Sequence, residues 1–133
     1  MHTEPRIPMA RLRAADLPHP DPGVYALYRD GQPIYVGVAE KQSLRDRFWG
    51  SHRGRGQSMT GSALRRNVAE HLGIAPAGDI KDGEYRPTLQ DAARVVAYID
   101  GCEVAWITCL NPAAAHRLEA DMKREYLPPL TKR

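Results

Sequence analysis

The stretch from residue 23 to residue 37, GVYALYRDGQPIYVG, constrains the fold most strongly, because it describes a tight β-hairpin. Two runs rich in β-branched and aromatic residues flank Asp30-Gly31, a dipeptide typical of a hairpin turn. A two-residue loop would put Tyr25 and Tyr35 on opposite sides of the ribbon. A three-residue loop over residues 29–31 would place them directly opposite each other on one side.

We expect the three-residue loop, because it gathers aliphatic side chains on the other face of the hairpin, where they can face a core. These side chains are Val24, Ala26, Ile34, Val36 and Val38. Tyrosines in hairpins are commonly packing partners across the two strands, so the hairpin alone does not assign them a function.

Helix patterns and one further strand follow the hairpin. Capping residues and apolar spacing predict helices over residues 43–49, 62–73, 88–101 and 111–126. In the third of these, the stripe expected to face the core is Leu89, Ala92, Val96 and Ile99. Residues 73–87 contain prolines and glycines that predict a connection. Residues 102–110 are almost entirely apolar, which predicts a central strand covered on both faces.

At 133 residues, the chain is expected to form one folded domain after an N-terminal arm over residues 1–21. No apolar run approaches the length of a membrane span, and the opening lacks a hydrophobic signal core, so we expect a cytoplasmic protein without a membrane partner. Cys102 and Cys109 would lie roughly 23 Å apart on one predicted strand, too far for a disulfide between them. No zinc-type spacing of cysteine and histidine is present, and the sequence carries no signal for an oligomeric state.

Positive charge is concentrated between residues 41 and 66. This segment holds seven lysines and arginines against the single acid Asp46, although the net charge of the whole chain is only +3. A basic segment interleaved with glycine and serine is typical of a surface that follows a nucleic-acid backbone. A helix face that is merely solvated usually mixes both signs of charge. The residues expected to contact nucleic acid are Lys41, Arg45, Arg53, Arg55, Arg65 and Arg66.

Glu119 places a carboxylate in the packing stripe of the last predicted helix, together with Ala115 and Met122. An ion pair with Lys123, four residues on, is the ordinary explanation for such a charge. A carboxylate that points inward nevertheless usually meets a cation or a donor. One carboxylate is enough to anchor a Mg²⁺ that keeps most of its waters. His116, three residues before Glu119, is a weaker candidate for a shared metal site.

Several short motifs occur in a specific order: Gly-Val-Tyr and Tyr-Val-Gly in the hairpin, Leu-Arg-Asp-Arg at 44–47, and a late glutamate before Pro-Pro-Leu. Together they resemble the GIY-YIG nuclease family over residues 22–131. The resemblance implies a small α/β domain, expected here over residues 22–133, with a central three-stranded β-sheet flanked by helices. It also implies cleavage of phosphodiesters with one divalent metal, Mg²⁺ or Mn²⁺.

The same resemblance implies a set of site residues. The positions that match the motif residues of the family are Tyr25, Tyr35, Arg47, His52 and Glu119. The first two are the motif tyrosines, the third is the arginine, the fourth is the histidine or tyrosine that follows it, and the last is the metal-binding glutamate. Thr131 stands where the family commonly has asparagine, so it keeps a hydroxyl near the site but no amide.

The resemblance, together with these residue types, predicts an endonuclease that hydrolyses phosphodiester bonds in DNA. The guanidinium of Arg47 would match phosphate oxygens in a bidentate fork, and a metal at Glu119 would neutralise charge. A phenol with a pKa of about 10 is a poor base at neutral pH, so either a tyrosine with a stabilised phenolate or His52 would activate the water. Two alternatives are a catalytically weakened or inactive nucleic-acid-binding module of the same fold, favoured by Thr131, and a domain in which the tyrosines only pack.

Overall fold

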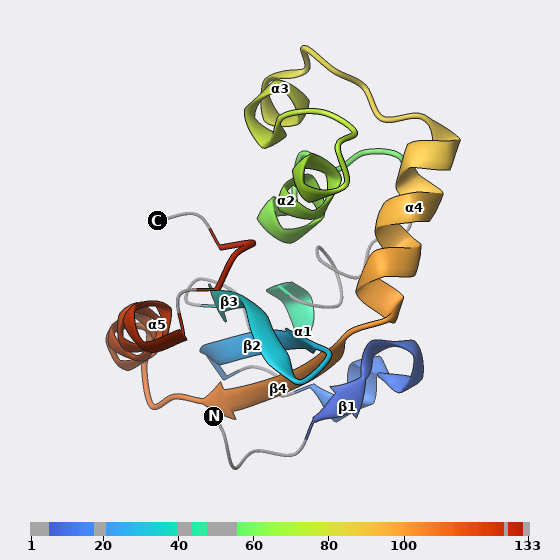
Figure 1. Cartoon of the computed structure of the whole chain (residues 1–133). Coiled ribbons are helices and arrows are strands. Elements are labelled where there is room, and N and C mark those ends of the chain that lie inside the picture. Colours follow the sequence, from blue (N-terminus) through green and yellow to red (C-terminus); the bar gives the residue numbers. More distant parts are fainter. Residues whose placement is uncertain (1–5, 18–20, 40–43, 48–55, 127, 132–133) are drawn as a thin grey trace.

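An antiparallel sheet of four strands, in the order β1-β4-β2-β3, forms the middle of the domain (Figure 1). The strands are β1 (Ile7–Pro8), β2 (Gly23–Arg29), β3 (Gln32–Ala39) and β4 (Glu103–Thr108). The structure is a computed structural model that describes residues 6–17, 21–39, 44–47, 56–126 and 128–131. The prediction of an α/β domain is confirmed, but the sheet has four strands and not three.

The fourth strand, β1, comes from the segment that the sequence analysis assigned to the arm. It pairs with the beginning of β4, and two 3-10 turns follow it, η1 (Met9–Arg11) and η2 (Ala14–Asp16). Three apolar side chains of this segment lie in the core, where Met9 is 0%, Leu12 3% and Leu17 1% exposed. A strand of two residues that ends in proline leaves no alternating pattern, so its sequence gives no strand signal.

The β2–β3 hairpin turns through two residues, so the predicted three-residue loop is wrong. Asp30 and Gly31 both have positive φ, 52° and 79°, as a type I′ turn requires. An irregularity between Leu27 and Tyr28 then shifts the register of the remaining strand pairs. This irregularity has the character of a β-bulge, with one residue of β3 left without a partner.

The bulge brings the tyrosines to one face by a route that the loop argument did not foresee. Tyr25 pairs with Gly37, and Tyr35 pairs with Leu27, so the tyrosines are diagonal neighbours on the same face and not a direct pair. Their ring centroids lie 6.2 Å apart, with an angle of 26° between the ring planes. The unpaired residue, Ile34, joins the core layer of the tyrosines, contrary to its predicted place on the aliphatic face.

Helices cover both faces of the sheet, which divides the core into two layers (Figure 1). On one face, α5 (Pro112–Tyr126) contributes Ala115 and Met122, which pack against Val24, Ala26 and Val36. On the other face lie α1 (Leu44–Arg47), α2 (Ala63–His71), α3 (Ala77–Asp82) and α4 (Leu89–Asp100). The predicted aliphatic face of the hairpin is therefore a core face, apart from Ile34 and the half-buried Val38.

Side-chain caps fix the starts of the long helices as predicted. The Asp91 amide donates to Thr88 Oγ1 over 3.0 Å and the Thr88 amide donates to the Asp91 carboxylate over 2.9 Å, which completes a capping box at α4. The Ala114 amide donates to Asn111 Oδ1 over 2.8 Å at the start of α5. Neither cysteine forms a disulfide, and β4 lies between β1 and β2, as expected of a central strand.

Two details of the helical layer differ from the prediction. Helix α3 lies inside residues 73–87, which were predicted as a connection; Pro76 precedes its first turn and Gly83, with φ 79°, ends it. The breakers that suggested a loop therefore mark the two ends of a short helix. In α4 the core side chain is Val95 and not Val96, and Leu89 is 73% exposed.

No helix in the described part of the chain is long and apolar enough to cross a membrane.

Truncation of Met9 tests whether the N-terminal segment belongs to the folded core. We expect Met9→Ala to lower the free energy of unfolding by about 2–5 kcal/mol, because it leaves a cavity in a buried site. Leu110→Ala is the control, since Leu110 is 94% exposed, and it should change stability by less than about 0.5 kcal/mol. Urea denaturation followed by circular dichroism measures both. Equal stabilities of the two variants would show that the segment is not part of the core.

Candidate active site

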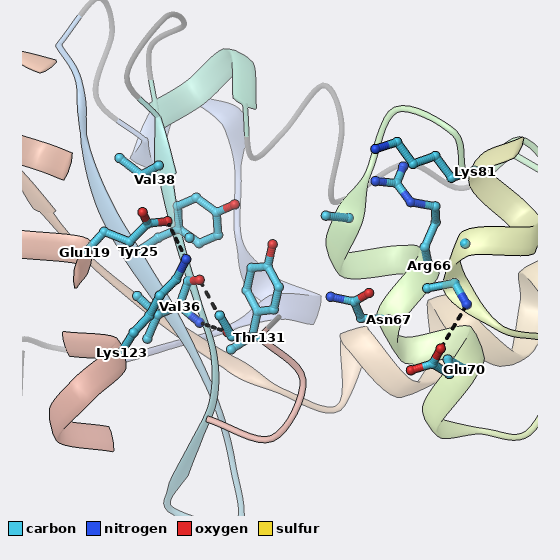
Figure 2. A pocket seen from close by; sticks show the side chains of 15 residues that line it. Tyr25, Val36, Val38, Arg66, Asn67, Glu70, Lys81, Glu119, Lys123 and Thr131 are labelled. Carbon is cyan, nitrogen blue, oxygen red and sulfur yellow. Dashed lines mark hydrogen bonds and ion pairs between the residues drawn. The ribbon is translucent and has the colours of Figure 1, made fainter. Parts of the chain in front are cut away.

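A cavity of about 550 Å³ opens between the sheet and the α2–α3 pair (Figure 2). One side, called here the sheet wall, consists of side chains from β2, β3, α5 and the C-terminal residues. Its polar members are Tyr25, Tyr35, Glu119, Lys123 and Thr131. The opposite side, called here the α2–α3 wall, has as its polar members Arg66, Asn67, Glu70 and Lys81. The cavity therefore gathers both motif tyrosines and the predicted metal ligand from three separate elements.

Tyr25 and Tyr35 reach the cavity from the core, since only 1% and 6% of their surfaces are exposed. Tyr25 lies over its cross-strand partner Gly37, where a Cβ atom would collide with the phenol ring and its hydroxyl. Glycine at position 37 thus makes room for the ring, which occupies the space that a side chain at this position would take. The bulge and this glycine together hold two phenols side by side at the cavity.

Glu119 is a buried carboxylate, 8% exposed, on the α5 stripe that also carries Ala115 and Met122. Its Oε2 lies 3.4 Å from the Lys123 ammonium, so the expected ion pair is present (Figure 2). The same carboxylate lines the cavity, so the ion pair and the position near the tyrosines coexist. His116 Nδ1 lies 3.9 Å from Glu119 Oε1 and its side chain is 65% exposed, which places it at the edge of this group.

Residues 128–131, called here the closing segment, run along the outer edge of β3. The Leu130 amide donates to the Ile34 carbonyl over 2.9 Å, and the Val36 amide donates to Thr131 Oγ1 over 2.8 Å (Figure 2). From the other side of the cavity, Asn67 Nδ2 donates to the Leu130 carbonyl over 2.8 Å. The closing segment is therefore the bridge that joins the two walls.

The arginines of the predicted nucleic-acid surface do not all face solvent. Arg65 is 3% exposed, and its guanidinium donates to the carbonyls of Ser58 and Gly56 over 2.8 and 2.5 Å. Burial lowers the pKa of this guanidinium, and its donors are directed at the chain. Arg65 is therefore buried and bound to the chain, contrary to its predicted place on a surface that contacts nucleic acid. A count of charges could not reveal that loop carbonyls needed a buried donor at this position.

The structure describes only some of the other basic residues and motif residues that were predicted for the site. Arg45 donates from Nε to the Leu17 carbonyl over 3.1 Å, and Arg66 lines the cavity. The backbone of Arg47 lies in α1, but its side chain is outside the described part of the structure. Residues that lie wholly outside the described residues are Lys41, His52, Arg53 and Arg55.

The sequence analysis did not name four polar residues of the cavity as site residues: Asn67, Glu70, Lys81 and Lys123. Asn67 is buried, with 6% of its surface exposed. The available signal in the sequence was its position beside Val68, where a polar residue stands at the margin of the apolar stripe of α2. Lys81 stands on α3, and because that helix was predicted as a connection, no face could be assigned to its residues.

The donor set at Glu119 fits a hydrated divalent cation. Within the described residues no group of three or more histidine, cysteine, aspartate or glutamate side chains could enclose a metal ion. Mg²⁺ commonly binds through one or two carboxylates and keeps several waters. A single buried carboxylate at the border of a 550 Å³ cavity provides that combination of one ligand and space for water.

Comparison with known proteins assigns the chain to a family. Residues 22–133 match the family model of the GIY-YIG catalytic domain, so the chain belongs to this family and is a GIY-YIG-type endonuclease domain. The resemblance noted in the motifs is thus confirmed over most of the chain. No curated protein matches the chain significantly.

Solved structures agree on the fold. Three crystal structures of the GIY-YIG N-terminal endonuclease domain of UvrC from Thermotoga maritima superpose with a TM-score of 0.50 each. Two are tyrosine-to-phenylalanine variants and one is an asparagine-to-alanine variant, and each is bound to the catalytic divalent cation of that domain. The sequence identities are 20%, 21% and 21%, and the matches cover 93% of this chain and 96% of the other. At this identity the similarity concerns the fold.

Removal of the Asn67 amide tests the bridge between the two walls. We expect Asn67→Ala to lower the free energy of unfolding by about 1–3 kcal/mol, because the buried Leu130 carbonyl loses its donor. Gln90→Ala is the control, since Gln90 is an exposed residue of α4. Urea denaturation measures stability, and hydrogen exchange of the Leu130 and Val36 amides reports whether the closing segment has loosened. Exchange and stability like those of Gln90→Ala would contradict the bridge.

Proposed function

We propose that this protein is a metal-dependent endonuclease that hydrolyses phosphodiester bonds in DNA at the cavity between the two walls. The observation that carries the proposal is the convergence of two tyrosines and one buried carboxylate on a single cavity. These are the three motif residues whose side chains the structure describes. Family membership supports nucleic acid as the substrate class.

Glu119 is the residue that would hold the metal, Mg²⁺ or Mn²⁺. The buried carboxylate and the adjacent open volume support this role, and the UvrC domains of similar fold are bound to a catalytic divalent cation. When bound, such a cation supplies neutralisation of charge on the phosphoryl oxygens and the leaving oxygen. Lys123 lies beside Glu119 and would keep the positive charge near the phosphate.

The remaining motif residues would orient the phosphate and move protons. Arg47 would clamp the phosphate through its guanidinium, which matches two oxygens at once. Tyr25 and Tyr35 would place their hydroxyls beside the reacting phosphate and hold the attacking water through hydrogen bonds. The proton of that water would pass to a tyrosine or to His52, the two choices that the residue types allow.

A second candidate function is a nucleic-acid-binding module of the same fold with weakened or lost catalysis. Thr131 favours it, because threonine replaces the asparagine that is common in the family. The Thr131 hydroxyl also accepts a hydrogen bond from the Val36 amide, so it is engaged with the backbone of β3. A side chain held in this way supports the shape of the cavity and supplies no amide to a substrate.

Conversion of supercoiled plasmid to nicked and linear forms tests the proposed activity. With Mg²⁺ or Mn²⁺ present we expect cleavage by the wild type, and a loss of about a hundredfold or more in Glu119→Gln, because the metal ligand loses its charge. Glu125→Gln, at an exposed position on the same helix, should cleave normally. Cleavage by Glu119→Gln at the wild-type rate would refute the metal role, and wild-type DNA binding without nicking would favour the second candidate function.

The role of Arg47 can be tested separately. We expect Arg47→Ala to abolish cleavage while the unfolding midpoint stays near that of the wild type, and Arg47→Lys to remain strongly impaired because an ammonium cannot form the bidentate fork. Plasmid nicking measures activity and circular dichroism measures folding. Normal turnover by Arg47→Ala would show that another group binds the phosphate.

A further inference from the structure

The α2–α3 wall carries two cations on the side of the cavity that faces the tyrosines and Glu119. Arg66 extends from α2 and Lys81 from α3, and both side chains border the cavity (Figure 2). Lys81 is exposed, and its ammonium has no hydrogen-bond or ion-pair partner among the residues that the structure describes. The motifs of the hairpin and of α5 do not account for either residue.

Contacts within the chain fix the guanidinium of Arg66 and the backbone position of Lys81. Arg66 Nη1 donates to the carbonyls of Met59 and Thr60 over 3.2 and 2.5 Å, which fixes the guanidinium beside the loop before α2. Ile80, next to Lys81, is 1% exposed and anchors α3 in the core. The stem of Lys81 therefore starts from a fixed position, although the helix that carries it is short.

The charges around the cavity favour an anion on the α2–α3 side. Glu70 is the carboxylate of this wall, and its Oε1 accepts the Ala77 amide over 3.0 Å, which joins the start of α3 to α2. Arg66 and Lys81 together outweigh this acid by one charge, whereas Glu119 and Lys123 balance each other on the sheet wall. Among the residues that line the cavity, the surplus positive charge therefore lies on the α2–α3 wall.

We propose that the α2–α3 wall binds the phosphate backbone of the nucleic-acid strand next to the bond that is cut, with Lys81 as the main contact and Arg66 as the second. This inference rests on the proposed function, because it needs a strand lying between the two walls. Ammonium and guanidinium groups are the donors that bind phosphate oxygens in nucleic-acid complexes. Lys81 would determine the register of the strand and would take no part in proton transfer.

Binding without cleavage tests this contact. We would measure the fluorescence anisotropy of a labelled single-stranded oligonucleotide and of its duplex with the wild-type protein in EDTA, between about 50 and 200 mM salt. We expect Lys81→Gln to weaken binding about two- to fivefold at the lower salt. The slope of log K against log salt should fall by about one, and Lys81→Arg should restore both.

Arg117→Gln is the matched control, because it removes the same charge from an exposed position of α5 that does not border the cavity. Lys81→Gln with the affinity and salt slope of Arg117→Gln would overturn the inference, and so would a wild type that binds no oligonucleotide. If inorganic phosphate bound as tightly as the oligonucleotide and Lys81→Gln removed both, the wall would be a site for free phosphate, which would also overturn it.

Failure of the proposed function would look different from failure of this inference. If the wild type binds oligonucleotide in a salt-dependent way but never nicks plasmid, and Lys81→Gln weakens that binding as expected, the strand contact would be supported and the nuclease refuted. Nicking that depends on Glu119 but is indifferent to Lys81, in both rate and oligonucleotide affinity, would support the nuclease and refute the contact.

Discussion

Ile34, which has no strand partner, decides on which face of the sheet Tyr25 and Tyr35 lie. The two-residue turn at Asp30-Gly31 would, in a regular hairpin, send Tyr25 and Tyr35 to opposite faces. The bulge at Ile34 shifts the register by one residue, and both rings arrive on the face that borders the cavity. The site therefore depends on a local defect in strand pairing, which the protein keeps because the layers on both faces of the hairpin are buried.

Helix α5 shows how packing positions a charged group. Ala115 and Met122 press the helix onto β2 and β3, and Glu119 lies on the same stripe, so the burial of the apolar pair fixes the location of the carboxylate. Burial of an ionised group is costly unless a partner offsets it. Lys123, one turn further along, supplies that partner at 3.4 Å. The carboxylate thus lies at the edge of the core, paired with Lys123, and borders the cavity.

The sequence indicated which side chains border the cavity better than how they reach it. Glu119 could be found because a charge in an apolar helix stripe is visible in the spacing, and the tyrosines were correctly placed on one face although the loop that placed them was wrong. Helix α3 could not be found, because Pro76 and Gly83 are the same residues that end a helix or fill a loop. The burial of Arg65 could not be predicted, since the carbonyls that it binds become its neighbours only after the chain has folded. Strand β1 was too short to show a period.

The closing segment has a consequence for the behaviour of the protein in a crowded solution. An outermost strand offers unpaired backbone groups to which another polypeptide can add. Leu130 and Thr131 occupy those groups of β3 at Ile34 and Val36, and Asn67 holds the segment in place. Detachment of these few residues would deform the cavity and at the same time expose an unpaired strand edge. Loss of activity and self-association would then arise from one local event.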